Sequence, residues 1–262
     1  MVSFGTTYRE TREKNIDRIA QDMAEWLEKQ PSGGRLKPCV YQAYSSKMVR
    51  RILKERDGII MPDTTQALEQ MREDGITHVS VLSTHIIEGL EHNKITQEAN
   101  RCAGWFEQLS VSKALLTYKE DYREAAEALW QELQEQLRGD VLLLMGHGTS
   151  HEADESYVKM EQELRAVSGH RCYVATVEGA VTIELALQHM KQEGVMDGRV
   201  LTLPFMLVAG DHAIHDMAGE KESFVSILRE NGYEPECLLK GLGEYEGIRR
   251  LYRKHIEEIF ER

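Results

Sequence analysis

Long apolar runs are missing from this sequence of 262 residues. No window approaches the roughly 18 consecutive apolar residues that a membrane-spanning helix requires. The opening MVSFGTTYRE has neither the basic start nor the apolar stretch of a secretion signal, and is typical of a shortened first strand that runs into a loop. We therefore expect a cytoplasmic protein with no membrane association.

Cysteine is scarce, and its positions exclude two kinds of site. The four cysteines are Cys39, Cys102, Cys172 and Cys237, and no two of them form a C-x-x-C pair. This spacing argues against a zinc knuckle or a thioredoxin-like motif and is consistent with a reducing compartment.

The sequence also has fewer basic than acidic residues, and it lacks the common phosphate-binding motifs. Lys and Arg number 32 against 44 Asp and Glu, which gives a net charge of −12 that would repel nucleic acid. Neither G-x-x-x-x-G-K-[ST] nor a G-x-G-x-x-G after a strand occurs. We therefore expect no nucleic-acid partner and no nucleotide cofactor.

What the sequence does contain is a regular alternation of short apolar runs and longer amphipathic stretches. The runs predict strands at 1–4, 39–43, 78–82, 113–117, 141–145, 172–176, 200–203 and 236–239. The amphipathic stretches predict helices at 10–30, 46–55, 64–73, 91–109, 121–137, 155–167, 180–192, 214–231 and 244–260. Such alternation predicts an α/β fold with parallel sheets flanked by helices.

The eight predicted strands divide into two halves that resemble each other. Val2-Ser3-Phe4-Gly5-Thr6-Thr7 and Leu144-Met145-Gly146-His147-Gly148-Thr149 both end a strand in a glycine loop before a helix. We predict two similar lobes, 1–120 and 121–262, each with a four-stranded parallel sheet. The active site would lie in the cleft between them, and the last helix would be free to pack back on the first lobe.

Three loops of the second half carry side chains that suit metal chemistry. His147 lies between two glycines after a strand, Glu178 precedes Gly179 and a helix, and His212 begins another helix. Each has an ordinary alternative: a capping loop for His147, a helix-dipole role for Glu178, and a surface helix for His212, whose neighbour His215 shares its face. Because loops at the carboxyl ends of parallel strands surround ligands, the three side chains are candidates for an open divalent-metal site.

Two stretches resemble one known family. Gly146-His147-Gly148-Thr149-Ser150-His151 and the run from Leu203 to Ala213, with Leu-Val-Ala-Gly-Asp-His at its centre, are similar to the anaerobic sirohydrochlorin cobaltochelatases. The opening strand, the segment 56–59, His85-Ile86-Ile87 and Gly241-Leu242-Gly243-Glu244 carry the same likeness, so that it covers the whole chain. Departures are the shortened first strand and Thr149, neither of which affects a proposed ligand.

The resemblance implies a bilobal chelatase fold and ATP-independent insertion of Co²⁺ into sirohydrochlorin during cobalamin synthesis. It assigns the metal site and the catalytic roles to His147, Glu178 and His212, and gives His85 no role. Co²⁺ is then the substrate metal, and sirohydrochlorin or a related tetrapyrrole is the partner, with a homo-oligomer left open.

The acidic chain raises the question of how a polycarboxylate ring would be captured. Arg9 and Arg12 follow the first strand-end loop and are candidates for pairing with ring carboxylates. Met206 and Leu207 are candidates for packing on the ring, although ordinary core packing explains apolar residues as well.

Three other functions remain open at this point. A ferrochelatase-like or nickel chelatase would use the same ligand types, since imidazole and carboxylate also suit Fe²⁺ and Ni²⁺. A metal or tetrapyrrole carrier on a bilobal scaffold would bind without metallating. A nucleotide-binding α/β protein has the least support, because the phosphate motifs are missing.

Overall fold

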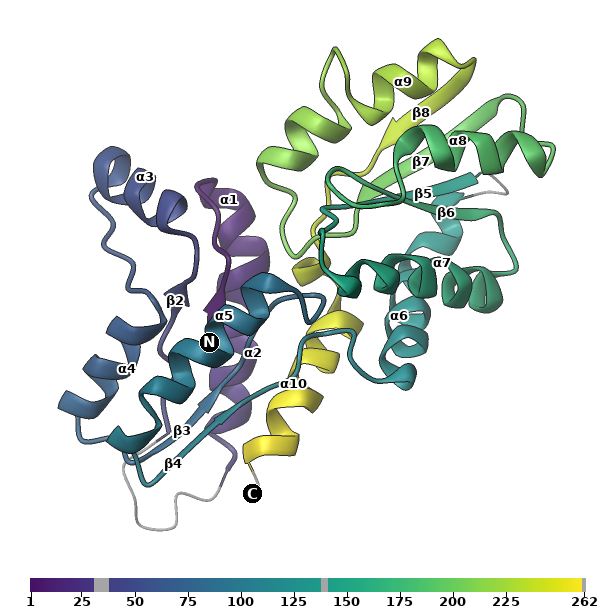
Figure 1. The fold of residues 1–262 in the computed structure, drawn as a ribbon. Helices are drawn as coiled ribbons and strands as arrows, with labels where there is room; N and C mark the ends of the chain where they lie inside the picture. Colours follow the sequence, from purple (N-terminus) through teal and green to yellow (C-terminus); the bar gives the residue numbers. More distant parts are fainter. Residues whose placement is uncertain (31–37, 138–140, 261–262) are drawn as a thin grey trace. The chain divides into compact units, whose positions relative to one another are not determined.

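The computed structural model describes residues 1–30, 38–137 and 141–260. The chain forms two compact units, one of Met1–Thr117 with Arg249–Arg262 and one of Tyr118–Ile248. Both are built from parallel strands and helices, as the alternation predicts (Figure 1). Within the described ranges, no helix is both long and apolar enough to cross a membrane.

The second unit contains one four-stranded parallel sheet in the order β6-β5-β7-β8. Its elements are α6 (Lys119–Leu137), β5 (Val141–Gly146), η3 (Glu152–Asp154), α7 (Glu155–Ser168), β6 (Cys172–Thr176), α8 (Ile183–Gln192), β7 (Gly198–Pro204), η4 (Ala213–Met217), α9 (Phe224–Glu230), β8 (Tyr233–Cys237), η5 (Leu242–Glu244) and the first residues of α10 (Glu246–Phe260). Both faces of the sheet are covered, with α8 and α9 on one side and α6 and α7 on the other (Figure 1).

Alternate residues of β5 explain why this sheet is buried on both faces. Leu143 and Met145 pack in a core with residues of α8 and α9 such as Leu187 and Leu228. Leu142 and Leu144 point to the opposite face and are equally buried. A continuous apolar run of this kind is the signature of a central parallel strand.

The first unit repeats the strand order of the second in a less regular form. Its elements are β1 (Val2–Ser3), α1 (Arg9–Arg12), η1 (Glu13–Asp17), α2 (Arg18–Leu27), β2 (Ala43–Tyr44), α3 (Lys47–Asp57), α4 (Thr64–Glu73), β3 (His78–Val81), α5 (Leu90–Arg101), η2 (Ala103–Trp105) and β4 (Gln108–Val111). The expected four-stranded sheet consists of two parallel ladders, β1-β2 and β3-β4. A bridge between Val2 and Ser83 joins them, with the Val2 N–H donating to Leu82 O at 2.8 Å.

The strands of both units therefore lie in the order second, first, third, fourth. In such a sheet the crevice for a ligand opens where the order reverses, between the carboxyl ends of the first and third strands. That position lies between β1 and β3 in the first unit and between β5 and β7 in the second.

From Arg249 onward, helix α10 belongs to the first unit, and its side chains contact other residues of that unit. Arg249 Nε donates to Asp22 Oδ2 at 2.6 Å, and Tyr252 Oη donates to Thr84 O at 2.8 Å. The rings of Trp26 and Phe260 meet edge to face, 5.0 Å apart.

Two stretches differ from the predicted elements. The predicted strand 113–117 is wrong: its Leu115 and Leu116 are buried, but their N–H groups bond to the loop at His85 and Ile86. The fourth strand is instead Gln108–Val111, which begins in the last two residues of the predicted helix 91–109, because that helix ends at Arg101. An apolar run signals burial, and burial alone does not distinguish a strand from a packed loop.

The predicted helix 214–231 is interrupted. A π-helical turn, Ala213–Met217, is followed by bends, and α9 begins only at Phe224. Ser223 caps α9 by accepting the Ser226 N–H at 3.1 Å, and the Ser226 hydroxyl lies 2.9 Å from the Ser223 N–H. Two reciprocal bonds of this kind start a new helix, which explains the break.

Candidate metal centre

His147 follows directly from the buried strand β5. Its Nδ1 lies 3.0 Å from the carbonyl oxygen of Gly148. Because a carbonyl oxygen only accepts, Nδ1 carries the hydrogen, and Nε2 keeps a lone pair that can bind a metal ion.

The glycines on either side of His147 are required by close packing. Gly148 has φ +83°, and a Cβ there would lie 2.2 Å from the backbone nitrogen of Gly179. A Cβ at Gly146 would lie 2.2 Å from the ring of Tyr157, whose hydroxyl accepts the Gly148 N–H at 3.2 Å. The loop that carries His147 is therefore held in one conformation, which only glycine permits.

His212 lies at the start of the π-helical turn that follows β7, and it is oriented by an acidic partner. Its Nδ1 is 2.6 Å from Oδ2 of Asp216, one turn further on. A carboxylate accepts this hydrogen bond, which fixes the ring and leaves Nε2 as the free nitrogen. Asp216 was not among the predicted site residues, although its spacing of four residues from His212, just before the predicted helix 214–231, was a usable signal.

The structure brings His147 and His212 together. Their ring centroids are 4.7 Å apart, and the ring planes are perpendicular. Their loops leave β5 and β7, the first and third strands of the unit, so the pair occupies the position where a ligand crevice is expected. Both side chains are partly exposed, and external groups can reach them.

The structure does not bring the carboxylate of Glu178 into the same group. The Glu178 backbone N–H donates to His147 O at 2.8 Å, so the two loops are neighbours, but the side chain is exposed. Across the described part of the chain, no three His, Cys, Asp or Glu side chains are grouped to hold a metal ion. The arrangement is thus an imidazole pair with a carboxylate loop alongside, and a two-nitrogen site leaves coordination positions for another ligand.

Asp154 ties these two loops together, and the sequence analysis did not identify it. Its Oδ1 accepts the Thr149 N–H at 3.0 Å, and its Oδ2 accepts the Ala180 N–H at 2.8 Å. Thr149 belongs to the His147 loop and Ala180 to the Glu178 loop. An aspartate at a helix start is ordinarily explained by capping alone, so its position in the sequence does not distinguish it.

We expect Asp154→Ala to weaken Co²⁺ binding by roughly 10- to 100-fold, since groups that orient metal ligands have effects of this size. Titration of the apoprotein with Co²⁺, followed by its visible absorption bands, measures this affinity. Glu152→Ala is the matched control, because Glu152 is an exposed carboxylate in the same turn. Equal affinities for the two variants would show that the link between the loops does not matter for the metal.

Of the four residues predicted to contact the tetrapyrrole ring, two lie in the first unit and two in the second. In the first unit, Arg9 is 84% exposed and pairs with Glu13 at 2.8 Å, whereas Arg12 is largely buried and pairs with Asp17 at 3.2 Å. In the second unit, Met206 packs against the core below the loop after β7. Leu207 is half-buried in that loop, and its carbonyl oxygen accepts the Gly243 N–H at 3.0 Å.

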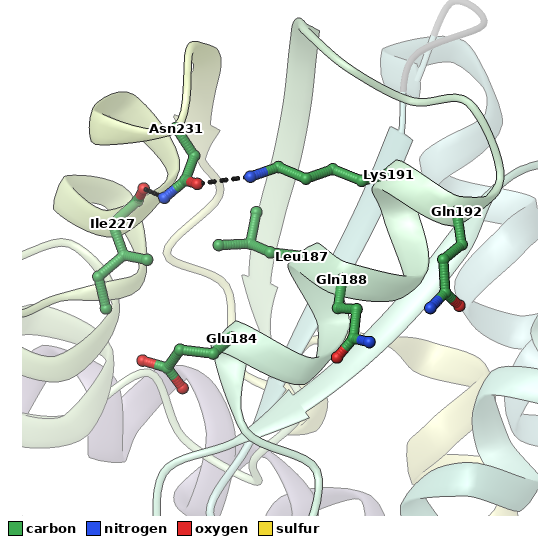
Figure 2. Close-up of a pocket in the computed structure, with 7 residues that line it drawn as sticks. All are labelled: Glu184, Leu187, Gln188, Lys191, Gln192, Ile227 and Asn231. Atoms are coloured by element: carbon green, nitrogen blue, oxygen red, sulfur yellow. Dashed lines mark hydrogen bonds between the residues drawn. The ribbon is translucent and has the colours of Figure 1, made fainter.

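A groove elsewhere in the second unit is not part of this site. It has a volume of about 480 Å³ and lies between α8 and α9, where Leu187 and Ile227 line it (Figure 2). The Lys191 ammonium donates to Asn231 Oδ1 at 2.8 Å across it. None of the predicted site residues lines this groove.

The fold is shared with chelatases. A structure of SirB from Bacillus subtilis with Fe³⁺ matches with a TM-score of 0.63 and 13% identity, over 98% of this chain and 93% of that one. A multi-domain protein from Deinococcus radiodurans, described as structurally similar to chelatases, matches with a TM-score of 0.60 and 16% identity, over 98% of this chain and 54% of that one. These two likenesses show that the chain shares the fold of those proteins.

Sequence comparison then gives the family. The model of the family described as cobalt chelatase (CbiK) matches residues 1–261. The sirohydrochlorin cobaltochelatase of Salmonella typhimurium is 32% identical over 259 residues, which is 98% of this chain and 94% of the relative. The sirohydrochlorin cobaltochelatase CbiKC of Nitratidesulfovibrio vulgaris is 33% identical over 222 residues, 82% of this chain and 76% of the relative. The chain belongs to the cobalt chelatase (CbiK) family.

Proposed function

We propose that this protein inserts Co²⁺ into sirohydrochlorin without ATP, as a step of anaerobic cobalamin synthesis. The observation that carries the proposal is the pair of perpendicular imidazoles, 4.7 Å apart, at the carboxyl ends of β5 and β7. Family membership and the names of the two relatives support the choice of metal and ring.

Insertion requires the metal to be held, but not enclosed. In the proposed reaction, His147 and His212 bind Co²⁺ through their Nε2 atoms, because Nδ1 of each ring is engaged with Gly148 O or Asp216. Neutral imidazole is a suitable ligand for Co²⁺. Two protein nitrogens bind less tightly than a closed four-ligand cage, so ring nitrogens can displace water and then take over the metal.

In the proposed reaction, Glu178 supplies a third ligand to the metal, and its side chain is free to move. Its backbone is fixed beside His147, while its exposed side chain is free to change rotamer. We assign it the role of completing the metal site when Co²⁺ binds, as the family resemblance implies. Release of the ion to the ring then breaks one carboxylate and two imidazole contacts.

The capture of a polycarboxylate ring needs local positive charge on an acidic protein. Arg9 suits this role better than Arg12, because it is 84% exposed and pairs with Glu13 in an ion pair at the surface. Arg12 is 18% exposed and has Asp17 as its partner. Met206 and Leu207 supply apolar surface beside the imidazole pair.

The cysteines and the net charge indicate the setting in which the protein works. All four cysteines are free thiols, which suits the reducing cytoplasm. The net charge of −12 opposes binding to nucleic acid. A nucleotide has no role in the proposed reaction, and a homo-oligomer would not alter it.

Anaerobic spectrophotometry of the purified protein tests the proposal. With sirohydrochlorin and Co²⁺, and without nucleotide, we expect the absorption of the free ring to convert to that of the metallated ring at a catalytic rate. Parallel reactions with Fe²⁺, Ni²⁺ and protoporphyrin distinguish this function from a ferrochelatase or nickel chelatase. Stoichiometric binding of the ring without metallation would identify a carrier and contradict the proposal.

A further inference from the structure

The two imidazoles of the proposed metal site are held by different kinds of acceptor. His212 Nδ1 lies 2.6 Å from the Asp216 carboxylate, whereas His147 Nδ1 lies 3.0 Å from the backbone carbonyl oxygen of Gly148. A hydrogen bond to an ionised acceptor is shorter and about twice as strong as one between neutral groups. All of these groups belong to the second unit.

This difference makes the two rings unequal ligands for a metal ion. A carboxylate on Nδ1 draws the hydrogen toward itself, and the ring then donates more electron density through Nε2. The neutral Gly148 oxygen polarises the His147 ring less. Nε2 of His212 is therefore the stronger donor of the pair.

The turn that carries Asp216 is fixed by the core of the second unit. Its first and last residues, Ala213 and Met217, are fully buried in that core. Its backbone closes with the wide spacing of a π-helix, since the Ala218 N–H donates to Ala213 O at 3.2 Å, and turns of this kind are frequent at functional sites. Asp216 and His212 are 41% and 40% exposed, so they lie on the side of the turn that external groups reach.

A purely structural role for Asp216 would be slight. In the part of the chain that the structure describes, its carboxylate bonds to no group other than His212. The two residues belong to one turn, so their hydrogen bond ties no separate segments together. A half-exposed pair four residues apart adds little to stability. The effect of the carboxylate therefore falls on the ring of His212.

From this geometry we propose that Asp216 makes His212 the more tightly bound of the two cobalt ligands, so that His147 is displaced first when the tetrapyrrole arrives. The proposal rests on the function proposed above. The bond between Co²⁺ and His147 Nε2 breaks as the lone pair of an unprotonated ring nitrogen takes its coordination position, and no proton moves in this exchange. His212 holds the ion during the exchange and is displaced afterwards.

Unequal ligands reconcile the retention of the ion with its release. Two equally strong ligands would have to weaken together before the ring could take the metal. With one weaker ligand, a ring nitrogen can bind Co²⁺ while the ion is still held by the protein. Asp216 is thus a positioning residue that acts through His212.

The variant Asp216→Asn removes the charge and keeps the hydrogen bond. An amide oxygen can still accept the Nδ1 hydrogen, so the His212 ring keeps its orientation. We expect the dissociation constant of Co²⁺, titrated alone into the apoprotein, to rise about 10-fold, the lower end for groups behind metal ligands because both side chains are half-exposed. The visible absorption bands of bound Co²⁺ should persist and move to longer wavelength, since a weaker donor splits the d orbitals of the metal less. Asp216→Glu, which returns the charge, should regain most of the affinity.

Asp211→Asn is the matched control, because it removes the same charge from the same segment. Asp211 is 73% exposed, and its Oδ1 lies 3.6 Å from Nε2 of His215, which is not part of the imidazole pair. Its Co²⁺ affinity should equal that of the wild type, since exposed charges are largely screened. Equal losses of affinity in Asp211→Asn and Asp216→Asn, or no loss in Asp216→Asn, would overturn the proposal.

Single-turnover insertion into sirohydrochlorin tests the order of displacement. In Asp216→Asn, the Co²⁺ concentration that gives half the maximal rate should rise, while the rate at saturating Co²⁺ equals or exceeds that of the wild type, because a weaker His212 ligand is released more easily. A saturated rate that falls together with the affinity would indicate a merely structural role and would overturn the order of displacement. Failure of the wild type to insert cobalt would overturn the proposed function and the order of displacement with it, whereas the Co²⁺ titrations would still show whether Asp216 makes the two ligands unequal.

Discussion

Replacing His147 or His212 with alanine is expected to reduce cobalt insertion by at least about 100-fold, because in the proposed reaction each supplies one of the two nitrogens that hold the ion. The two rings lie 4.7 Å apart on loops that leave different strands, so neither can replace the other. The measurement is the anaerobic change in sirohydrochlorin absorbance, together with titration of each apoprotein by Co²⁺ alone. Both variants should lose the Co²⁺ absorption bands as well as turnover.

His215→Ala is the matched control for this experiment. His215 lies three residues after His212, but its side chain is 65% exposed and its nearest acidic partner is Asp211 at 3.6 Å. We expect normal turnover and normal Co²⁺ affinity in this variant. If His212→Ala and His215→Ala behaved alike, the imidazole pair would have no special part in insertion.

The meeting of these two histidines could be predicted from sequence because the strand order leaves little choice. The apolar runs identify the strands of the second unit, and a parallel α/β sheet brings the loops after its first and third strands to one edge. His147 and His212 stand in those two loops. The pattern of apolar residues predicts the strands and the shared edge, and the structure adds the strand order that makes β5 and β7 neighbours.

The direction of the Glu178 side chain could not be predicted from the sequence. Its loop follows β6, and the sequence correctly indicates that this loop neighbours the His147 loop, as the hydrogen bond from Glu178 N to His147 O shows. The direction of an exposed carboxylate is set by rotamers of similar energy, and a strand pattern carries no information about them. In the proposed reaction, binding of Co²⁺ is what turns the Glu178 side chain toward the imidazoles.

Burial of an apolar run does not by itself indicate a strand. Leu115 and Leu116 are as buried as any core strand, but their backbone bonds to an irregular loop at His85 and Ile86. The true fourth strand, Gln108–Val111, is only half-buried and polar at alternate positions. An edge strand of this kind is difficult to distinguish from the end of an amphipathic helix.

Residues that act through others were the least predictable from sequence. Asp154 contacts Ala180, 26 positions later, and Ser83 joins two histidines on different segments. An aspartate near a helix start has an ordinary capping role, and Ser83 simply follows a predicted strand, so nothing local distinguishes either position. Only the folded backbone shows which N–H and imidazole groups they reach.

Gly148→Ala is expected to have the second large effect, on both stability and metal binding. A left-handed φ of +83° costs a residue with a Cβ about 1–2 kcal/mol. The added methyl group would also lie 2.2 Å from Gly179 N, which is backbone and cannot rotate away. Relief requires the His147 loop and the Glu178 loop to separate, which moves His147 away from His212 and should abolish measurable Co²⁺ binding.

Gly169→Ala isolates the contribution of the backbone angle from that of the clash. Gly169 ends α7 with φ +68°, and a Cβ built there meets nothing within 4 Å. It should lower the midpoint of urea unfolding by an amount equivalent to about 1 kcal/mol and leave cobalt insertion intact. Gly148→Ala should be less stable than this control by a further 1–3 kcal/mol or so, the usual cost of overpacking. Equal midpoints and normal Co²⁺ binding in Gly148→Ala would mean that the two loops separate without disturbing the imidazoles, and that close loop packing does not position His147.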